Sequence, residues 1–140
     1  MKIVIIEDEE FAARRLENMI LEYDPGIIVS AKLESVSESI TWFNSNPEPD
    51  LIFLDIHLED DLSFSIFDKV QVSSSIIFTT AFDEYAIRAF KLRSIDYLLK
   101  PIIQEELNNA IKKYKDFVKP SVQTVDLTSL YNLITQKNLI

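Results

Sequence analysis

The sequence predicts a single α/β domain in which helices cover both faces of a parallel β-sheet. Three observations support this fold class: short apolar runs alternate with longer amphipathic segments, the apolar runs are rich in β-branched residues, and 140 residues suffice for one hydrophobic core but not for two. Because crossovers between parallel strands are right-handed, five successive strand-and-helix units should form a doubly wound domain.

Five apolar runs predict the strands. The sequences KIVII, LIFL and IIF are unbroken, as expected for strands that are covered by helices on both faces. The predicted strands span residues 2–6, 27–33, 51–55, 75–80 and 95–99.

Amphipathic segments between these runs predict five helices. The first places five apolar residues on one helical face: Ala12, Leu16, Met19, Ile20 and Tyr23. Pro25 and Gly26 follow as a stop signal. The other segments cover about 37–44, 62–70, 85–90 and 107–117, and the fifth begins with acids and ends with lysines, which suits the helix dipole.

The domain should span residues 1–118, with a linker at Lys119-Pro120-Ser121. Beyond it, four apolar residues share one helical face: Leu127, Leu130, Tyr131 and Ile134. A five-unit domain has no obvious place for this tail, so we expect the tail of residues 119–140 to dock on a partner chain or to lead into a further segment.

Composition excludes several function classes. A net charge of −9 disfavours direct contact with nucleic acid, and the basic run at 112–115 is explained by the end of the fifth helix. The single glycine excludes a glycine-rich phosphate loop, and the lack of cysteine excludes thiol chemistry and disulfides. Apolar runs of about five residues predict no membrane insertion, and without a signal-peptide pattern we expect a cytoplasmic location.

Polar residues stand at the carboxyl ends of the predicted strands, where doubly wound sheets bind ligands. They are the pair Glu7-Asp8 after the first strand, Asp55 after the third, Thr80 after the fourth and the pair Lys100-Pro101 after the fifth. Each has an ordinary explanation: an acid here can cap the first helix, the threonine suits a strand, and the lysine suits a surface. Asp55 is the hardest to explain in this way, because it ends the most apolar strand and a buried lone carboxylate is costly.

Taken together, the same residues predict a site for a cation and a phosphoryl group. Two carboxylates about 4 Å apart repel by roughly 4 kcal/mol at an effective dielectric constant of about 20, so three acids favour binding of a cation. A few oxygen ligands suit Mg²⁺, which also contacts phosphate. Lys100 and the Thr80 hydroxyl would complete the surroundings of a carboxylate that attacks phosphorus.

Four motifs resemble the receiver domain of bacterial two-component response regulators: IIEDEE, LIFLDIHL, IIFTTA and DYLLKPI, over about residues 2–118. The run TTAFDEYAIRAFKLRSIDYLLKPI resembles receivers that precede a LytTR-type DNA-binding domain. The resemblance implies a flavodoxin-like (βα)5 fold with strand order 2-1-3-4-5.

The resemblance also implies roles for site residues. Asp55 resembles the phosphoacceptor, and Asp8 and Asp55 resemble direct Mg²⁺ ligands. Glu7 resembles the acid that acts through water, and His57 matches the position whose backbone carbonyl completes the metal site, its imidazole being a loop side chain.

Three further residues match the switching machinery of the family. Thr80 resembles the switch hydroxyl and Lys100 the lysine that pairs with phosphoryl oxygens; the Lys100-Pro101 bond is typically cis in this family. Tyr97 resembles the aromatic residue that turns inward together with the switch hydroxyl. Packing of a strand aromatic on the last helix would explain Tyr97 equally well. In the loop DIHLEDDLSF, Asp60 and Asp61 replace the glycine that receivers often carry, and we expect an unusual loop shape and an effect of these acids on metal affinity.

The resemblance implies a phosphorylation-dependent switch that catalyses only its own phosphorylation and dephosphorylation. One implied partner is a sensor histidine kinase. A second is another receiver, bound through the face of helix four, strand five and helix five, with Ile87 as an apolar contact. DNA would be bound only through a C-terminal domain absent from this chain. The sequence is also compatible with two alternatives: a Mg²⁺-dependent phosphatase of the haloacid dehalogenase class, and a receiver fold used only for docking.

Overall fold

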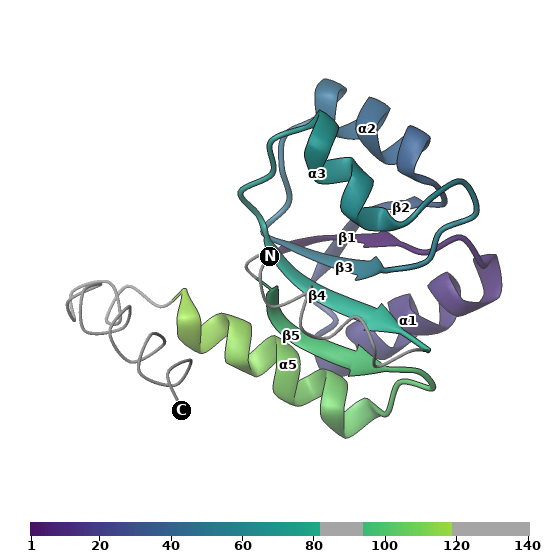
Figure 1. Cartoon of the computed structure of the whole chain (residues 1–140). Coiled ribbons are helices and arrows are strands. Elements are labelled where there is room, and N and C mark those ends of the chain that lie inside the picture. The colour runs from purple at the N-terminus through teal and green to yellow at the C-terminus, as the bar shows by residue number, and fades with distance from the viewer. Residues whose placement is uncertain (82–93, 119–140) are drawn as a thin grey trace, which may run out of the picture.

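The computed structural model describes residues 1–81 and 94–118 and contains a five-stranded parallel sheet with strand order β2-β1-β3-β4-β5 (Figure 1). This confirms the predicted fold class and strand order. The strands are β1 (Lys2–Ile6), β2 (Ile28–Leu33), β3 (Leu51–Asp55), β4 (Ser75–Thr80) and β5 (Ser94–Leu99).

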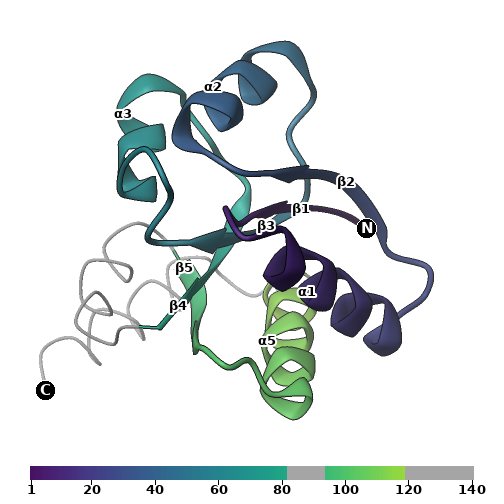
Figure 2. The ribbon, with the colours of Figure 1, turned by 90° about the vertical axis from the view of Figure 1, so that its right-hand side faces the viewer.

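Helices lie on both faces of the sheet. The described helices are α1 (Glu10–Tyr23), α2 (Val36–Ser45), α3 (Ile66–Lys69) and α5 (Gln104–Phe117). Figure 2 shows α1 and α5 together on one face and α2 and α3 on the other. None of these helices has the length and apolar character that a membrane crossing demands.

Two predicted helices are not found as predicted within the described residues. The predicted third helix is shorter than expected, because a 3-10 turn (Ser63–Ser65) takes up the first part and only Ile66–Lys69 is α-helical. The predicted fourth helix, with Ile87, and the tail of residues 119–140 lie outside the described residues.

The unbroken apolar strands supply two cores. Alternate residues of a strand face opposite sides, so Ile3 and Ile5 enter the cluster under α1 and α5, whereas Val4 and Ile6 enter the cluster under α2 and α3. All five residues of β3 are buried for the same reason. A strand covered on both sides therefore has no room for the polar alternation of a half-exposed strand.

The register of the parallel strands brings residues that are distant in the sequence together at the carboxyl ends of the strands. Ile6 pairs with Leu54, and the next residues along the two strands are Glu7 and Asp55. Thr80 pairs with Leu99, and the backbone N–H of Lys100 donates to the Thr80 carbonyl over 2.7 Å. The carboxyl ends of β1, β3, β4 and β5 therefore present their polar residues side by side.

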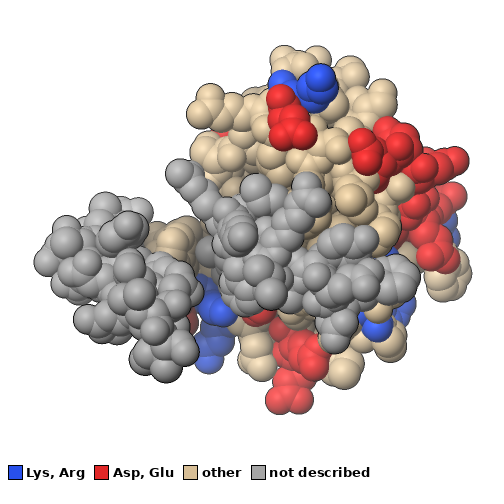
Figure 3. Space-filling model, in the orientation of Figure 1, with Lys and Arg blue, Asp and Glu red and all other residues tan. Residues whose placement is uncertain are grey.

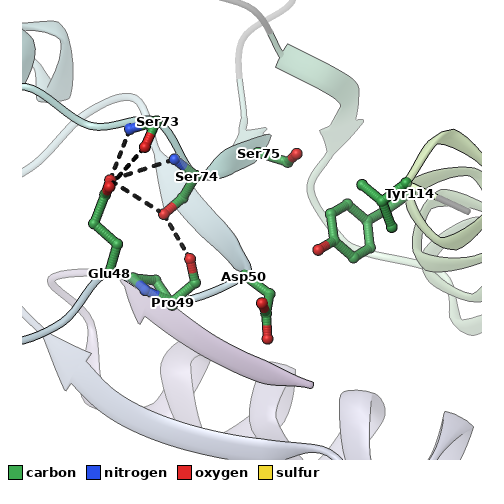
Figure 4. Close-up of a pocket in the computed structure, with 8 residues that line it drawn as sticks. Glu48, Pro49, Asp50, Ser73, Ser74, Ser75 and Tyr114 are labelled. Carbon is green, nitrogen blue, oxygen red and sulfur yellow. Dashed lines mark hydrogen bonds between the residues drawn. The ribbon is translucent and has the colours of Figure 1, made fainter. Parts of the chain in front are cut away.

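At the opposite ends of the strands, polar side chains surround a shallow surface pocket (Figure 4). The Glu48 carboxylate accepts hydrogen bonds from the backbone N–H and the hydroxyl of Ser73, both at 2.7 Å, and weaker ones from Ser74 at 3.4 Å. Burial acts to raise the pKa of Glu48, but these hydrogen bonds outweigh burial and hold the pKa below its ordinary value of 4.5. Glu48 therefore ties the start of β4 to the chain that enters β3.

We predict that Glu48→Gln lowers the free energy of unfolding at pH 7 by about 1 kcal/mol, because hydrogen bonds to a charged acceptor are stronger than neutral ones but those of the exposed Glu48 are screened by water. Since the folded-state pKa is lowered, the contribution of the carboxylate is present above pH 4.5 and is lost as the pH falls through the folded value. Urea unfolding of both proteins between pH 7 and pH 3 should show the difference shrinking with acid. A difference that stays constant would assign the effect to the amide itself.

Candidate functional site

Three carboxylates meet at the carboxyl ends of the two inner strands β1 and β3. One oxygen from each of Glu7, Asp8 and Asp55 lies within 4.8 Å of the others. Glu7 and Asp55 directly continue or end buried strands, and only 4% and 5% of their surfaces are exposed. Three acids that the sequence separates by up to 48 positions thus form one cluster.

Lys100 joins two of these acids from the neighbouring end of β5. Its ammonium group pairs with the Asp55 carboxylate over 2.8 Å and also with the Glu7 carboxylate. Burial acts to lower the pKa of Lys100, but the hydrogen bonds to Asp55 and Glu7 outweigh it and raise the pKa above its ordinary value. Lys100 is therefore charged whenever the two acids are ionised.

The cluster as a whole remains negative. Three carboxylates and one ammonium group leave two negative charges when all are ionised. Burial raises the pKa of Asp8, and the adjacent Glu7 carboxylate adds to this through a hydrogen bond and through repulsion. The site therefore has the charge that a divalent cation would neutralise.

Backbone donors orient the two buried acids. The Glu9 N–H donates to Glu7 over 3.2 Å, and the His57 N–H donates to Asp55 over 3.3 Å. Glu9 occupies the N-cap position of α1 but its side chain makes no capping hydrogen bond. Helix capping by Glu9 is thus not the explanation for the acidic run, and Asp8 belongs to the cluster.

The other predicted site residues lie close by in the fold. Thr80 is buried at the end of β4, between the ends of β3 and β5. The Lys100-Pro101 peptide bond is cis. The imidazole of His57 is exposed in the loop after β3.

Tyr97 does not pack on the last helix, which was one of its two expected roles. It is partly buried against the cluster under α2 and α3, on the face of the sheet opposite α5. Alternation along β5 explains this, because the neighbouring residue Leu98 enters the cluster under α5 instead.

Asp60 and Asp61 are not members of the acidic cluster. Asp60 accepts hydrogen bonds from the backbone of α2, and Asp61 accepts from the N–H of Leu62 and the hydroxyl of Ser65. Both carboxylates thus serve helix starts. The sequence signal for this was an acid two or three residues before a helical turn, but the partner helix of Asp60 could not be read from it.

The arrangement suits a hard divalent cation and a phosphoryl acceptor. All three ligand candidates are carboxylates, which is the donor set that Mg²⁺ prefers, and few protein ligands leave positions for water and phosphate. Figure 3 shows acidic side chains gathered on the side of the molecule toward which the strands of Figure 1 point. Such a field favours cation entry.

We predict that Asp8→Asn stabilises the metal-free protein at pH 7 by about 1 kcal/mol, a fraction of the full repulsion between neighbouring carboxylates because Asp8 is partly solvated. The folded-state pKa of Asp8 is raised, so ionisation of Asp8 as the pH rises through that value removes stability. The gain should accordingly vanish as the pH falls toward 3.8. Thermal unfolding in a chelator measures it; a loss of stability at pH 7 would contradict the electrostatic interpretation.

Comparisons with known proteins agree with the site. The family model described as the response regulator receiver domain matches residues 3–112. The sensory transduction protein LytT of Bacillus anthracis is 34% identical over 118 residues, and the transcriptional regulatory protein LytR of Staphylococcus aureus is 36% identical over 118 residues. Each alignment covers 82% of this chain and 47% of the relative, so the chain spans about half the length of these relatives.

Solved structures show the same fold. The response regulatory domain of protein mrkE from Klebsiella pneumoniae superposes with a TM-score of 0.74 at 27% identity, covering 83% of this chain and 96% of that one. A two-component response regulator from Clostridium difficile gives a TM-score of 0.70 at 28% identity, covering 81% and 94%. The chain belongs to the response regulator receiver domain family of two-component systems and is similar to the receivers of LytT and LytR regulators.

Proposed function

We propose that Asp55 accepts a phosphoryl group from a phosphohistidine of a sensor histidine kinase, in a reaction that requires Mg²⁺. The observation that carries the proposal is the convergence of Glu7, Asp8 and Asp55 with the ammonium group of Lys100. A nucleophilic carboxylate needs a cation site and a fixed ammonium group beside it to neutralise the phosphoryl oxygens.

In the proposed transfer, a carboxylate oxygen of Asp55 attacks phosphorus. The new P–O bond forms as the P–N bond to the kinase imidazole breaks, and the bonding pair returns to the imidazole nitrogen, which takes up a proton. Lys100 changes partners during this step, since its ammonium group can pair with a phosphoryl oxygen in place of the Asp55 carboxylate. The chain performs this chemistry only on itself and is not a turnover enzyme.

Mg²⁺, when bound, would neutralise charge on the phosphoryl oxygens and on the acids. The residues that would hold it are Asp8 and Asp55 directly, Glu7 through water, and the backbone carbonyl of His57. His57 is two residues after Asp55 in the loop that follows β3, and the His57 N–H donates to the Asp55 carboxylate. These residues fit Mg²⁺ because all of the donors are backbone or carboxylate oxygens, which this ion prefers as ligands.

Thr80 and Tyr97 are proposed to carry the switch. The Thr80 hydroxyl would follow the phosphoryl group, and Tyr97 would turn inward behind it, which changes the face made by helix four, β5 and α5 so that two receivers pair. Moving a 1:99 mixture to 99:1 takes about 5.5 kcal/mol of differential interaction, which a few charged hydrogen bonds can supply.

The wider role is also a proposal. Two similar proteins are named as sensory transduction and transcriptional regulatory proteins and are about twice as long as the aligned segment. By analogy, the receiver of residues 1–118 would control transcription in the cytoplasm through a LytTR-type DNA-binding domain, with residues 119–140 leading toward it.

We predict that Asp55→Asn abolishes phosphoryl labelling, because the amide cannot act as the nucleophile. Incubation with radiolabelled acetyl phosphate and Mg²⁺ should label the wild-type chain, and mass spectrometry should place the group on Asp55. Asp50→Asn is a matched control, because it removes a carboxylate at the opposite edge of the sheet. Equal labelling of Asp55→Asn and wild type would move the acceptor elsewhere, and rapid release of phosphate from added phosphoesters would favour the phosphatase alternative.

We predict that Thr80→Val keeps labelling on Asp55 but weakens beryllofluoride-dependent dimerisation about tenfold, because one hydrogen bond to the acceptor group is lost. Thr79→Val is the matched control, since Thr79 is equally buried but alternates to the other side of β4. Sedimentation with and without beryllofluoride and Mg²⁺ measures the dimer. Full dimerisation of Thr80→Val would reject the switch, and no response of the wild type would favour the docking alternative.

A further inference from the structure

The loop after Asp55 is a small hairpin rather than an open coil. His57 and Leu62 form an antiparallel bridge, in which the Leu58 N–H donates to the Asp61 carbonyl over 3.1 Å and the Ser63 N–H donates to the Ile56 carbonyl over 2.8 Å. The tip of this hairpin contains only residues 59 and 60. The two hydrogen-bonded arms therefore connect the tip to the base of the hairpin beside Asp55.

Asp60 attaches the hairpin tip to α2. Its Oδ1 accepts from the Val36 N–H over 2.9 Å, and its Oδ2 accepts from the Ser37 N–H over 3.0 Å. Val36 and Ser37 are the first two residues of α2, whose free N–H groups have no partner within the helix. One carboxylate thus accepts hydrogen bonds from two backbone N–H groups of α2, which lie 24 and 23 positions before Asp60 in the sequence.

This contact does not duplicate the ordinary cap of α2. The N-cap residue Ser35 already accepts from the Glu38 N–H over 3.0 Å. Asp60 adds a charge at the positive end of the helix, and the Val36 N–H is the largest of the influences that lower its pKa. Because Ser35 already caps α2, the additional effect of Asp60 is to connect the loop to α2.

We propose that Asp60 is a positioning residue for the phosphorylation site: by holding the hairpin tip against α2, it fixes the backbone of residues 56–58, which supplies the N–H to Asp55 and the carbonyl proposed to meet Mg²⁺. This inference rests on the proposed function and deepens it. It replaces the expectation that Asp60 acts on the metal through its own charge, because its carboxylate is engaged with α2.

Three side-chain and backbone contacts define the path from Asp60 to the acceptor. The Leu58 side chain is buried in the core under α2 and α3, and the Ile56 N–H donates to the Thr79 carbonyl over 3.1 Å. Between these two fixed residues, His57 donates to Asp55 over 3.3 Å, which is a long hydrogen bond. His57 is adjacent to Leu58, whose N–H donates to the Asp61 carbonyl beside the tip, so a displaced tip would shift the donor of this bond.

The test compares Asp60→Ala and Asp60→Asn with Glu59→Gln, in the full chain. Glu59 is the exposed neighbour of Asp60, so its substitution removes the same charge from the same hairpin tip. Calorimetric titration with MgCl₂ gives the metal affinity, hydrogen exchange reports the amides of Val36, Ser37 and His57, and acetyl phosphate labelling gives the rate of phosphorylation. Asp60→Asn retains one carbonyl acceptor and serves if the alanine variant fails to fold.

We expect Asp60→Ala to weaken Mg²⁺ binding about three- to tenfold, at or below the lower end of the losses seen when residues behind metal ligands are removed, because Asp60 acts through the loop backbone. The His57 amide should exchange faster, labelling should slow by a similar factor, and Asp60→Asn should fall between alanine and wild type. Glu59→Gln should change the affinity less than about twofold, since its charge is solvated and screened.

Two results would overturn the proposal. Faster exchange at Val36 and Ser37 with unchanged metal affinity and labelling would make Asp60 a cap of α2 only. Equal weakening by Glu59→Gln would make the effect one of net charge. A wild-type chain that binds Mg²⁺ but is never labelled would instead reject the proposed function, and the affinity comparison would still decide the role of Asp60.

Discussion

The ammonium group of Lys100 is the interaction on which the site depends. Glu7 and Asp55 are almost fully buried at the ends of the two inner strands, and ionised carboxylates in such a position are costly unless they are paired. One cation pairs with two of the three acids, and the pKa of the third, Asp8, is raised by burial and by the adjacent Glu7 carboxylate. The residual negative charge prepares the site for a divalent ion, and the shared lysine prepares it for a group that brings further negative charge.

Much of this could be predicted from the sequence. Unbroken apolar runs identified the strands, and the topology of doubly wound sheets required the residues after β1, β3, β4 and β5 to meet at one edge. Glu7, Asp8, Asp55 and Lys100 do meet there. The prediction succeeded because it used only the ends of strands, whose positions follow from the register of a parallel sheet and not from the details of loops.

The remaining features depend on contacts that periodicity does not encode. The predicted third helix begins as a 3-10 turn, in which the buried Phe64 packs against Phe78 of β4 at a centroid distance of 5.5 Å. Tyr97 lies on the face away from α5, because alternation along a strand separates two faces without saying which helix covers each. Asp60 finds its donors on α2, and no local pattern links a loop acid to a helix that precedes it in the chain.

The placement of Lys100 has a consequence for folding. The compensating cation follows β5, which is an edge strand, whereas the acids follow inner strands that are synthesised much earlier. Any partly folded state in which β5 has not docked, or has frayed away, must therefore hold the acid cluster without its counter-charge. Detaching β5 costs electrostatic energy in addition to its backbone hydrogen bonds, so an edge strand of the sheet is also held to the central strands by charge.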